Sequence, residues 1–167
     1  MPSQASSPFE SLADAARASF PTESCRLIAL REHGDVGYGL FDTGPIGQPY
    51  LYGVNYERRD GKWSEGSSGN GPGWSQVGPV DGLGTWTVWD EAPPGADAVR
   101  SEFNGHVSEE PVTTGFYLAA WWEVPCEDDS SPRVTAFRIN GEWIPVPEWR
   151  EKMEQMARRV RPRATER

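Results

Sequence analysis

Residues 134–146 read VTAFRINGEWIPV, and the pair Asn140-Gly141 at their centre decides the fold class. Asn-Gly between two β-prone runs favours a type I′ turn, whose positive φ angles match the twist of paired strands. Phe137 and Ile139 alternate with polar residues, as in a strand with one buried face. This segment predicts an antiparallel β-hairpin.

The same kind of signal recurs toward the N-terminus. Short turns at residues 33–35, 60–61 and 104–105 each separate two β-prone runs, and further strands are predicted at 85–89 and 116–124. The run Phe116–Trp122 is apolar on both faces, which predicts a central strand covered on both sides. We therefore expect a mainly β (α+β) protein, built on an antiparallel sheet or a two-sheet sandwich.

Helices are predicted at both ends of this β region. Ser7 followed by Pro8 and Glu10 resembles a capping box, apolar residues follow at helical spacing, and Pro21 ends the helix. Trp149 begins a second series at helical spacing after Pro147. The predicted single domain, 1–167, has this order: 1–6 disordered, 8–20 helix, 26–146 antiparallel β core with a long glycine-rich loop at 66–84, 147–160 helix, and 161–167 basic tail.

The charge balance limits the partners. The chain has 16 basic and 25 acidic residues, net −9, so a phosphate backbone is repelled and nucleic-acid binding is not expected. No apolar run approaches the ~18 residues of a membrane span. With no secretory signal at the start, we expect a soluble, cytoplasmic protein. Residues 150–167 carry seven basic and three acidic residues. This basic tail either folds back on the acidic body or serves as a docking arm for an acidic partner.

Catalytic and metal-binding signals are weak. Cys25 and Cys126 are 101 residues apart and form no CxxC pair, which favours two reduced thiols over a disulfide. The two histidines, His33 and His106, belong to no metal-binding pattern, so no metal or cofactor is expected. The glycine-rich loop lacks the Lys-Ser/Thr of a phosphate-binding P-loop.

Two carboxylate pairs are compatible with general acid–base chemistry on a sheet. They are Asp42 with Glu57 and Glu65 with Glu123. Any acidic chain offers such pairs by chance, so surface charge is the favoured interpretation and no catalytic residue is assigned.

Aromatic residues supply the candidate binding site. Trp63 and Trp74 flank the stretch Gly66–Gly73 of the glycine-rich loop, and Asn70 lies within that stretch. In the step Trp121-Trp122 one ring must point to each face of the strand. Trp63, Asn70, Trp74 and Trp122 are therefore the predicted binding residues, for a protein partner or a sugar ring.

Two stretches carry a resemblance to known proteins. The segment Tyr50–Trp74 and the interrupted stretch APPGADAVRSEFNG…GFYLAAWWEVP…RVTAFRINGEWIP are similar to uncharacterised small β-rich proteins of high-GC Gram-positive bacteria. This resemblance implies no activity and no site. The strand rhythm also resembles immunoglobulin-like sandwiches, but the Cys-Trp-Cys core of that fold is missing.

Three functions are compatible with the sequence. The first is a non-catalytic interaction protein whose acidic, aromatic-bearing surface binds a protein partner, itself basic in the manner of toxins bound by immunity proteins. The second is a carbohydrate-binding module that uses exposed tryptophan rings. The third is a small carboxylate-dependent hydrolase. The oligomeric state is left open.

Overall fold

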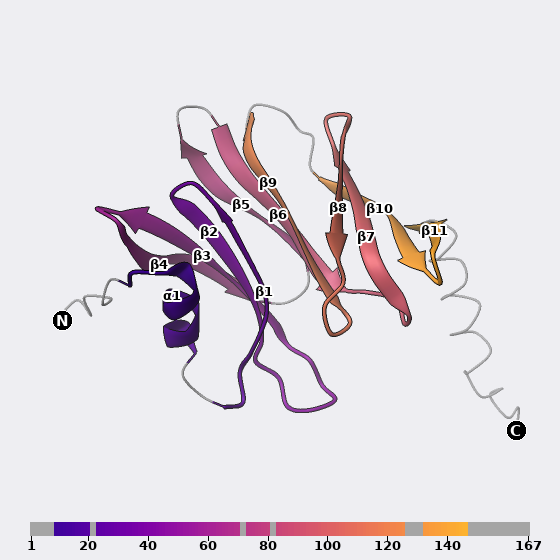
Figure 1. The fold of residues 1–167 in the computed structure, drawn as a ribbon, viewed down its shortest axis with the longest axis horizontal. Coiled ribbons are helices and arrows are strands. Elements are labelled where there is room, and N and C mark those ends of the chain that lie inside the picture. The colour runs from indigo at the N-terminus through magenta and orange to yellow at the C-terminus, as the bar shows by residue number, and fades with distance from the viewer. Residues whose placement is uncertain (1–8, 21–22, 71–72, 81–82, 126–131, 147–167) are drawn as a thin grey trace, which may run out of the picture.

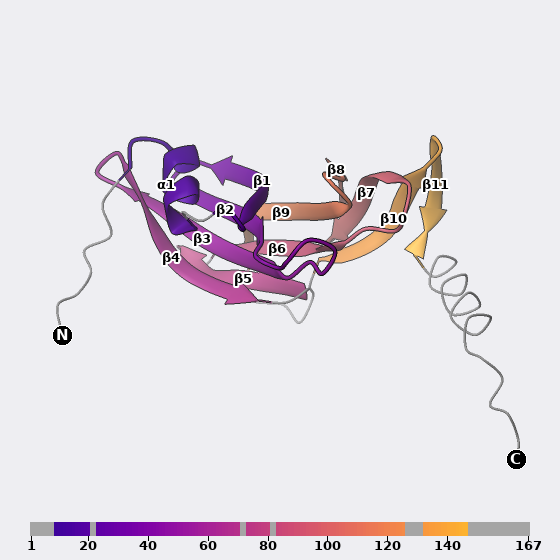
Figure 2. The same cartoon turned by 90° about the horizontal axis from the view of Figure 1, so that it is seen from below.

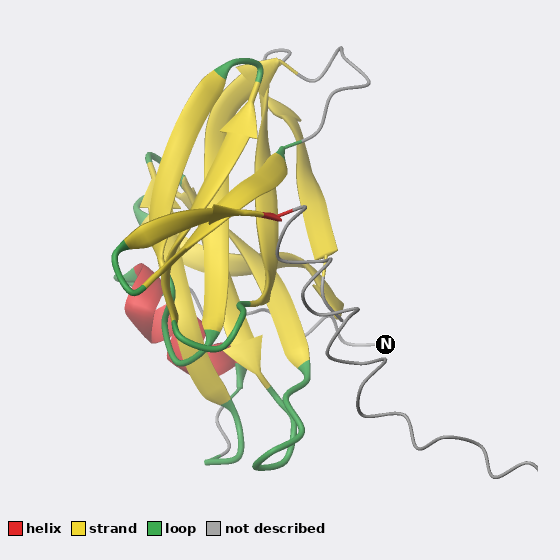
Figure 3. Cartoon of the chain, turned by 90° about the vertical axis from the view of Figure 1, so that its right-hand side faces the viewer, coloured by secondary structure: helices red, strands yellow, loops and turns green. Residues whose placement is uncertain are grey.

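The computed structural model describes residues 9–20, 23–70, 73–80, 83–125 and 132–146, which form a mainly β structure with one α-helix. The elements are α1 (Leu12–Ser19), β1 (Arg26–His33), β2 (Val36–Asp42), β3 (Leu51–Arg59), β4 (Lys62–Asn70), β5 (Gly73–Val80), β6 (Leu83–Glu91), β7 (Ala96–Phe103), β8 (His106–Pro111), β9 (Phe116–Pro125), β10 (Arg133–Ile139) and β11 (Glu142–Pro145). Strands dominate the described chain (Figure 3).

The strands form three antiparallel sheets, here called the first, middle and third sheets. Their strand orders are β1-β2-β3-β4, β5-β6-β9 and β11-β10-β7-β8. Figure 1 shows them in succession from the α1 end to the β11 end. The prediction of antiparallel β structure is confirmed. The two-sheet sandwich is replaced by three sheets, because the chain changes sheet between β4 and β5 instead of closing a hairpin there.

The middle sheet is buried on both faces. Leu118 of β9 packs with Tyr38 and other residues of the first sheet. Its neighbour Tyr117 points the other way and packs with Val99 and Phe137 of the third sheet. Both coverings predicted for this strand are present. The strand is nevertheless the last one in its sheet, so its central position was predicted wrongly.

The glycine turns are as predicted. Asp60, Asn104 and Asn140 have φ angles of 51°, 48° and 53°, and the glycine that follows each also has a positive φ. Residues in this left-handed region at both turn positions produce the type I′ geometry that suits a two-residue hairpin. The turn at Asn140 joins β10 to β11, so the hairpin read from residues 134–146 is confirmed.

The predicted loop at 66–84 is wrong. Strand β4 continues to Asn70, β5 covers Gly73–Val80, and β6 begins at Leu83. Glycine weakens a strand but does not prevent ladder hydrogen bonds, which the backbone makes without a side chain. Gly69 pairs with Gly53 of β3 in this way, and a register shift nearby marks a β-bulge in the same strand pair.

The N-terminal helix starts later than predicted. Helix α1 begins at Leu12 after the N-cap Ser11, whose hydroxyl accepts a hydrogen bond from the Asp14 amide at 3.1 Å. The predicted cap, Ser7, and the residues 1–6 lie outside the described residues. Phe9 is not helical, because its N–H and C=O bond to the backbone of Trp63. Figure 2 shows α1 on one face of the first sheet.

The two predictions made for the C-terminal residues are a helix at 147–160 and a basic tail at 161–167. Both segments lie outside the described residues. Helix α1 is accordingly the only helix in the described ranges.

Candidate functional site

The structure does not bring the predicted binding residues together. Trp63 lies in the core of the first sheet against α1, with 1% of its surface exposed. Trp122 lies on the middle sheet and packs against a different cluster. The side chains of Asn70 and Trp74 are outside the described part, so their role stays a prediction. A ring as buried as Trp63 offers little surface to a ligand.

Trp122 belongs to a contact between two sheets. The His33 ring stacks against it with centroids 5.7 Å apart and 15° between the ring planes. His33 Nε2 also lies 3.4 Å from a carboxylate oxygen of Glu123, the next residue on β9. Nearby, Arg31 of β1 forms an ion pair with Glu110 of β8 at 3.3 Å. These side chains connect β1 to its neighbours, and we assign them a structural role.

The carboxylate pair Asp42 and Glu57 is separated by the register of β2 and β3. Asp42 pairs with Leu51 at one end of the ladder, while Glu57 pairs with Val36 at the other end. The second pair is divided between sheets, because Glu65 belongs to β4 and Glu123 to β9. The structure thus lends no support to a carboxylate dyad at either place.

Asp42 is a buried carboxylate that organises a loop. Its Oδ1 accepts hydrogen bonds from the amides of Gly44 at 2.9 Å and Tyr50 at 3.0 Å, and its Oδ2 pairs with the Arg26 guanidinium. Burial raises the pKa of Asp42, but the Tyr50 and Gly44 amides and the Arg26 charge outweigh it, so the pKa lies below its ordinary value. The carboxylate is therefore a fixed anchor for the residues that follow β2.

The loop between β2 and β3 is held in one shape. A Cβ on Gly44 would lie 2.7 Å from the Tyr50 amide nitrogen, so only glycine fits there. The Gln48 amide bonds to the Pro45 carbonyl at 3.0 Å, and Gly47 has a φ of 82°. A positive φ at the third residue of such a turn is the mark of type II geometry. The turn carries Ile46 at its tip.

Ile46 is almost completely exposed, at 96%. Ile46 is not among the binding residues predicted from the sequence. The stretch DTGPIGQP at 42–49 holds a usable signal, since turn-forming Gly and Pro surround one large apolar residue between two strands. The pattern does not indicate that Asp42 is buried and holds the loop through the Gly44 and Tyr50 amides.

Every lysine and arginine in the described ranges is engaged by an acidic residue. The pairs are Arg17–Asp14, Arg26–Asp42, Arg31–Glu110, Arg58–Asp35, Arg59–Glu57, Lys62–Glu10, Arg100–Glu109, Arg133–Glu102 and Arg138–Asp97. Seven acidic residues of the same ranges have no Lys or Arg partner: Glu23, Glu32, Asp60, Glu65, Asp90, Glu91 and Glu142. Within these described ranges, the charge left for an outside partner is therefore negative.

Asp90 stands apart among these unpaired acids because it is half-buried. Burial raises its pKa, although the Glu91 amide, 2.7 Å from Oδ1, partly opposes the rise. A carboxylate kept in such a place costs stability at neutral pH, which is a common sign of a functional role. No second acid shares a proton with it in the register of β6, where Tyr117 lies opposite.

Cys25 is a free thiol, half-buried beside the first core cluster. Burial, followed by the negative charge of Asp42, raises the pKa of this thiol. A raised pKa lowers the thiolate fraction and hence the reactivity. Cys126 lies outside the described residues.

No group of three or more His, Cys, Asp or Glu side chains in the described ranges is arranged to hold a metal ion. Within those same ranges, no helix has the length and apolar character needed to cross a membrane. No known protein family, curated protein or solved structure matches the chain.

Proposed function

We propose that this chain is a non-catalytic binding protein whose acidic surface recognises a basic protein partner. The observation that carries the proposal is the pairing of charges. The chain's own acids engage all the described Lys and Arg side chains, while seven acids have no cationic partner there. Unpaired charge of one sign attracts a partner of the other sign and accelerates its association.

An immunity protein that neutralises a basic toxin is one form of this function. It needs a stable scaffold, a negative surface and no chemistry of its own. The three-sheet core supplies the scaffold, and the unpaired acids supply the surface. A cytoplasmic location is part of the same proposal.

The packing of the aromatic residues favours this proposal over carbohydrate binding. A sugar-binding platform needs an accessible ring face. Trp63, Trp86 and Trp89 are buried. Trp143 is half-buried on the third sheet, where the Arg100 guanidinium covers its ring at 4.0 Å. These rings serve packing, and cation–π contact in the case of Trp143.

Capture from a lysate of the native host, with the full chain immobilised, tests the proposal. A first variant replaces four exposed unpaired acids: Glu23→Gln, Glu65→Gln, Glu91→Gln and Glu142→Gln. A matched control replaces four acids that are already paired: Asp35→Asn, Glu57→Gln, Asp97→Asn and Glu109→Gln. Both variants change the net charge from −9 to −5; the first loses unpaired acids, and the control loses acids that pair with Arg58, Arg59, Arg138 and Arg100.

We expect the wild type and the control to retain one or a few basic proteins, and the first variant to retain at least about tenfold less. The retained proteins should also dissociate in high salt, because exposed charge pairs are screened. Retained proteins that are not basic, or equal losses in both variants, would refute the proposed function.

A further inference from the structure

Exposed apolar residues gather at one end of the first sheet. Five large apolar side chains of the described residues are exposed, and three of them belong to this end: Leu27 at 42%, Ile46 at 96% and Tyr50 at 49%. Leu27 and Tyr50 are near in the ladder, since Leu27 pairs with Phe41 and the Thr43 amide bonds to the Tyr50 carbonyl at 2.9 Å. We call Leu27, Ile46 and Tyr50 the apolar tip. Apolar side chains gathered in this way mark interaction surfaces.

The apolar tip is built on a rigid support. Asp42 holds both ends of the loop through the Gly44 and Tyr50 amides, and the type II turn fixes Ile46 between them. An anchor residue that is already fixed loses little conformational entropy on binding, which raises affinity. Three features hold Ile46 in its exposed position: the buried Asp42 carboxylate, Gly44, which has no room for a Cβ, and Gly47 with its positive φ.

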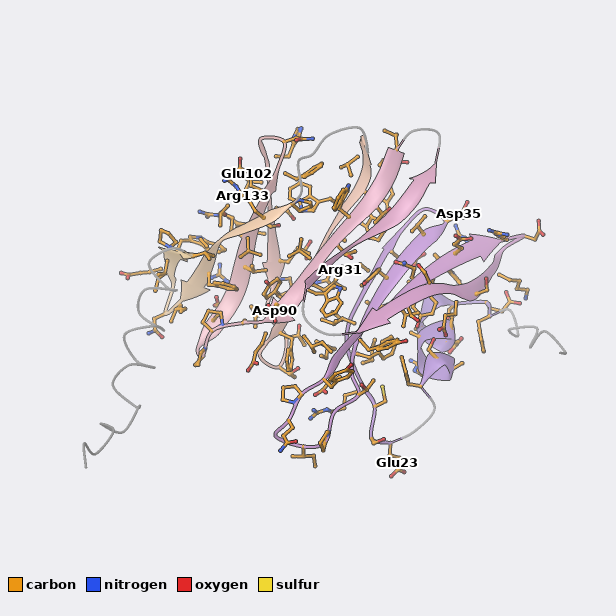
Figure 4. All side chains as sticks on the ribbon, turned by 180° about the vertical axis from the view of Figure 1, so that it is seen from behind. Glu23, Arg31, Asp35, Asp90, Glu102 and Arg133 are labelled. Carbon is orange, nitrogen blue, oxygen red and sulfur yellow. The ribbon has the colours of Figure 1, made fainter. Side chains whose placement is uncertain are left out.

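Two unpaired acids, Glu23 and Glu91, lie on the side of the molecule that carries the apolar tip. Glu23 precedes β1, and Figures 1 and 3 both place the chain before β1 at the same end as the β2–β3 loop. Figure 4 labels Glu23 at this end of the molecule. Glu91 lies opposite Phe116 in the β6–β9 ladder, and Phe116 shares a core cluster with Leu51, the first residue after the loop. Arg26, the cation next to Leu27, is neutralised by Asp42.

We infer that the apolar tip is the docking surface for the basic partner of the proposed function, with Ile46 inserted into an apolar pocket whose rim carries Lys and Arg. The inference rests on the proposed function and adds the location of the surface that binds the partner. An apolar anchor surrounded by complementary charge is the usual composition of a binding hot spot. The surrounding negative charge favours a basic partner over a second copy of this chain, which would bring its own unpaired acids to the contact.

A library of random 12-residue peptides displayed on phage serves as the probe, selected on the immobilised full chain. Recovered peptides are then synthesised, and their affinities for three proteins are measured by fluorescence anisotropy: the wild type, Ile46→Asp and Val107→Asp. Val107 is the matched control, because it is an aliphatic residue 60% exposed on β8 of the third sheet. Thermal unfolding verifies that both variants are folded.

We expect peptides that combine Lys or Arg with large apolar residues. Ile46→Asp should weaken their binding at least about tenfold, and Val107→Asp should change it less than about twofold. Because Ile46→Asp makes the surface more acidic, a loss of binding to basic peptides reports the apolar contact and not the charge.

The other outcomes separate the two proposals. Basic peptides that bind Ile46→Asp as well as the wild type overturn the docking surface and leave the proposed function standing. Peptides without an excess of basic residues contradict the proposed function itself. Sedimentation equilibrium of the wild type and of Ile46→Asp tests whether the apolar tip binds a second copy of the chain. If the wild type is a dimer and Ile46→Asp is a monomer, the second copy occupies the tip, and the inference of a basic partner there is overturned.

Discussion

The indole N–H of Trp89 donates a hydrogen bond of 2.9 Å to the hydroxyl oxygen of Tyr38, which joins the middle sheet to the first sheet inside the core. Both residues are buried. The Tyr38 hydroxyl also lies over Gly53 of β3, where a Cβ would come within 2.8 Å of the Tyr38 ring carbon Cζ. A polar contact and a missing side chain thus determine together how the two sheets meet.

Replacement of Tyr38 by Phe removes the acceptor and leaves the Trp89 N–H buried. We expect the free energy of unfolding to fall by about 1–3 kcal/mol, the cost of an unsatisfied buried donor. Trp89→Phe and the double variant complete a thermodynamic cycle, measured by urea unfolding. Strictly additive effects in the cycle would show that the bond does not couple the two sheets.

Replacement of Gly53 by Ala places a methyl group against the Tyr38 ring. The strain of overpacking should lower stability by about 1–3 kcal/mol. Gly69→Ala is the matched control, because Gly69 pairs with Gly53 across the ladder and a Cβ there meets no atom within 4 Å. Its effect should stay within about 0.5 kcal/mol. Equal destabilisation by both changes in thermal unfolding would contradict the close approach of Tyr38.

The sequence is sufficient to predict the hairpins, because an Asn-Gly or Asp-Gly turn is decided by the φ angles of two adjacent residues. Asp60, Asn104 and Asn140 all have positive φ angles as that rule requires. The double-faced burial of the run from Phe116 is likewise visible in its composition. Both features depend on local chemistry.

The sequence-based predictions are wrong where contacts between residues far apart in the chain determine the local structure. Residues 66–84 contain many glycines, yet β3 and β6 supply partner backbones that hold most of the segment in strands. Ser7 and Ser11 are both suitable N-caps, and the backbone pairing of Phe9 with Trp63 selects Ser11. The apolar tip was not predicted, because its rigidity depends on the burial of Asp42. No local sequence pattern indicates that this residue is buried.

Asp42→Asn tests the anchor of the loop. The pKa of Asp42 is lowered in the folded state, so its contribution to stability is fully present above the ordinary value of about 3.9 and is lost as the pH falls through the folded value. At pH 7 the variant should be less stable by about 1.5–3 kcal/mol, as for hydrogen bonds to a charged group. Urea unfolding from pH 7 to pH 2 should show this difference shrinking. A difference that does not depend on pH would rule out the ionised anchor.

Asp90→Asn should behave in the opposite way. Because the pKa of Asp90 is raised by burial, the unfolded chain ionises more readily, and the carboxyl destabilises the folded state above a pH of about 4. The variant keeps an acceptor for the Glu91 amide and should be more stable than the wild type at pH 7. The gain should vanish near pH 3, where both states are protonated. A variant less stable than the wild type at neutral pH would contradict this assignment.

Carbodiimide cross-linking of the complex captured from the host lysate identifies the acids that touch the partner, because this reagent joins a carboxylate to a lysine only where the two are in contact. If unpaired acids hold a basic partner, mass spectrometry will find links from unpaired acids such as Glu23 and Glu91 to lysines of the partner. Links confined to acids already paired within the chain, such as Asp97 and Glu109 of the third sheet, would contradict the claim.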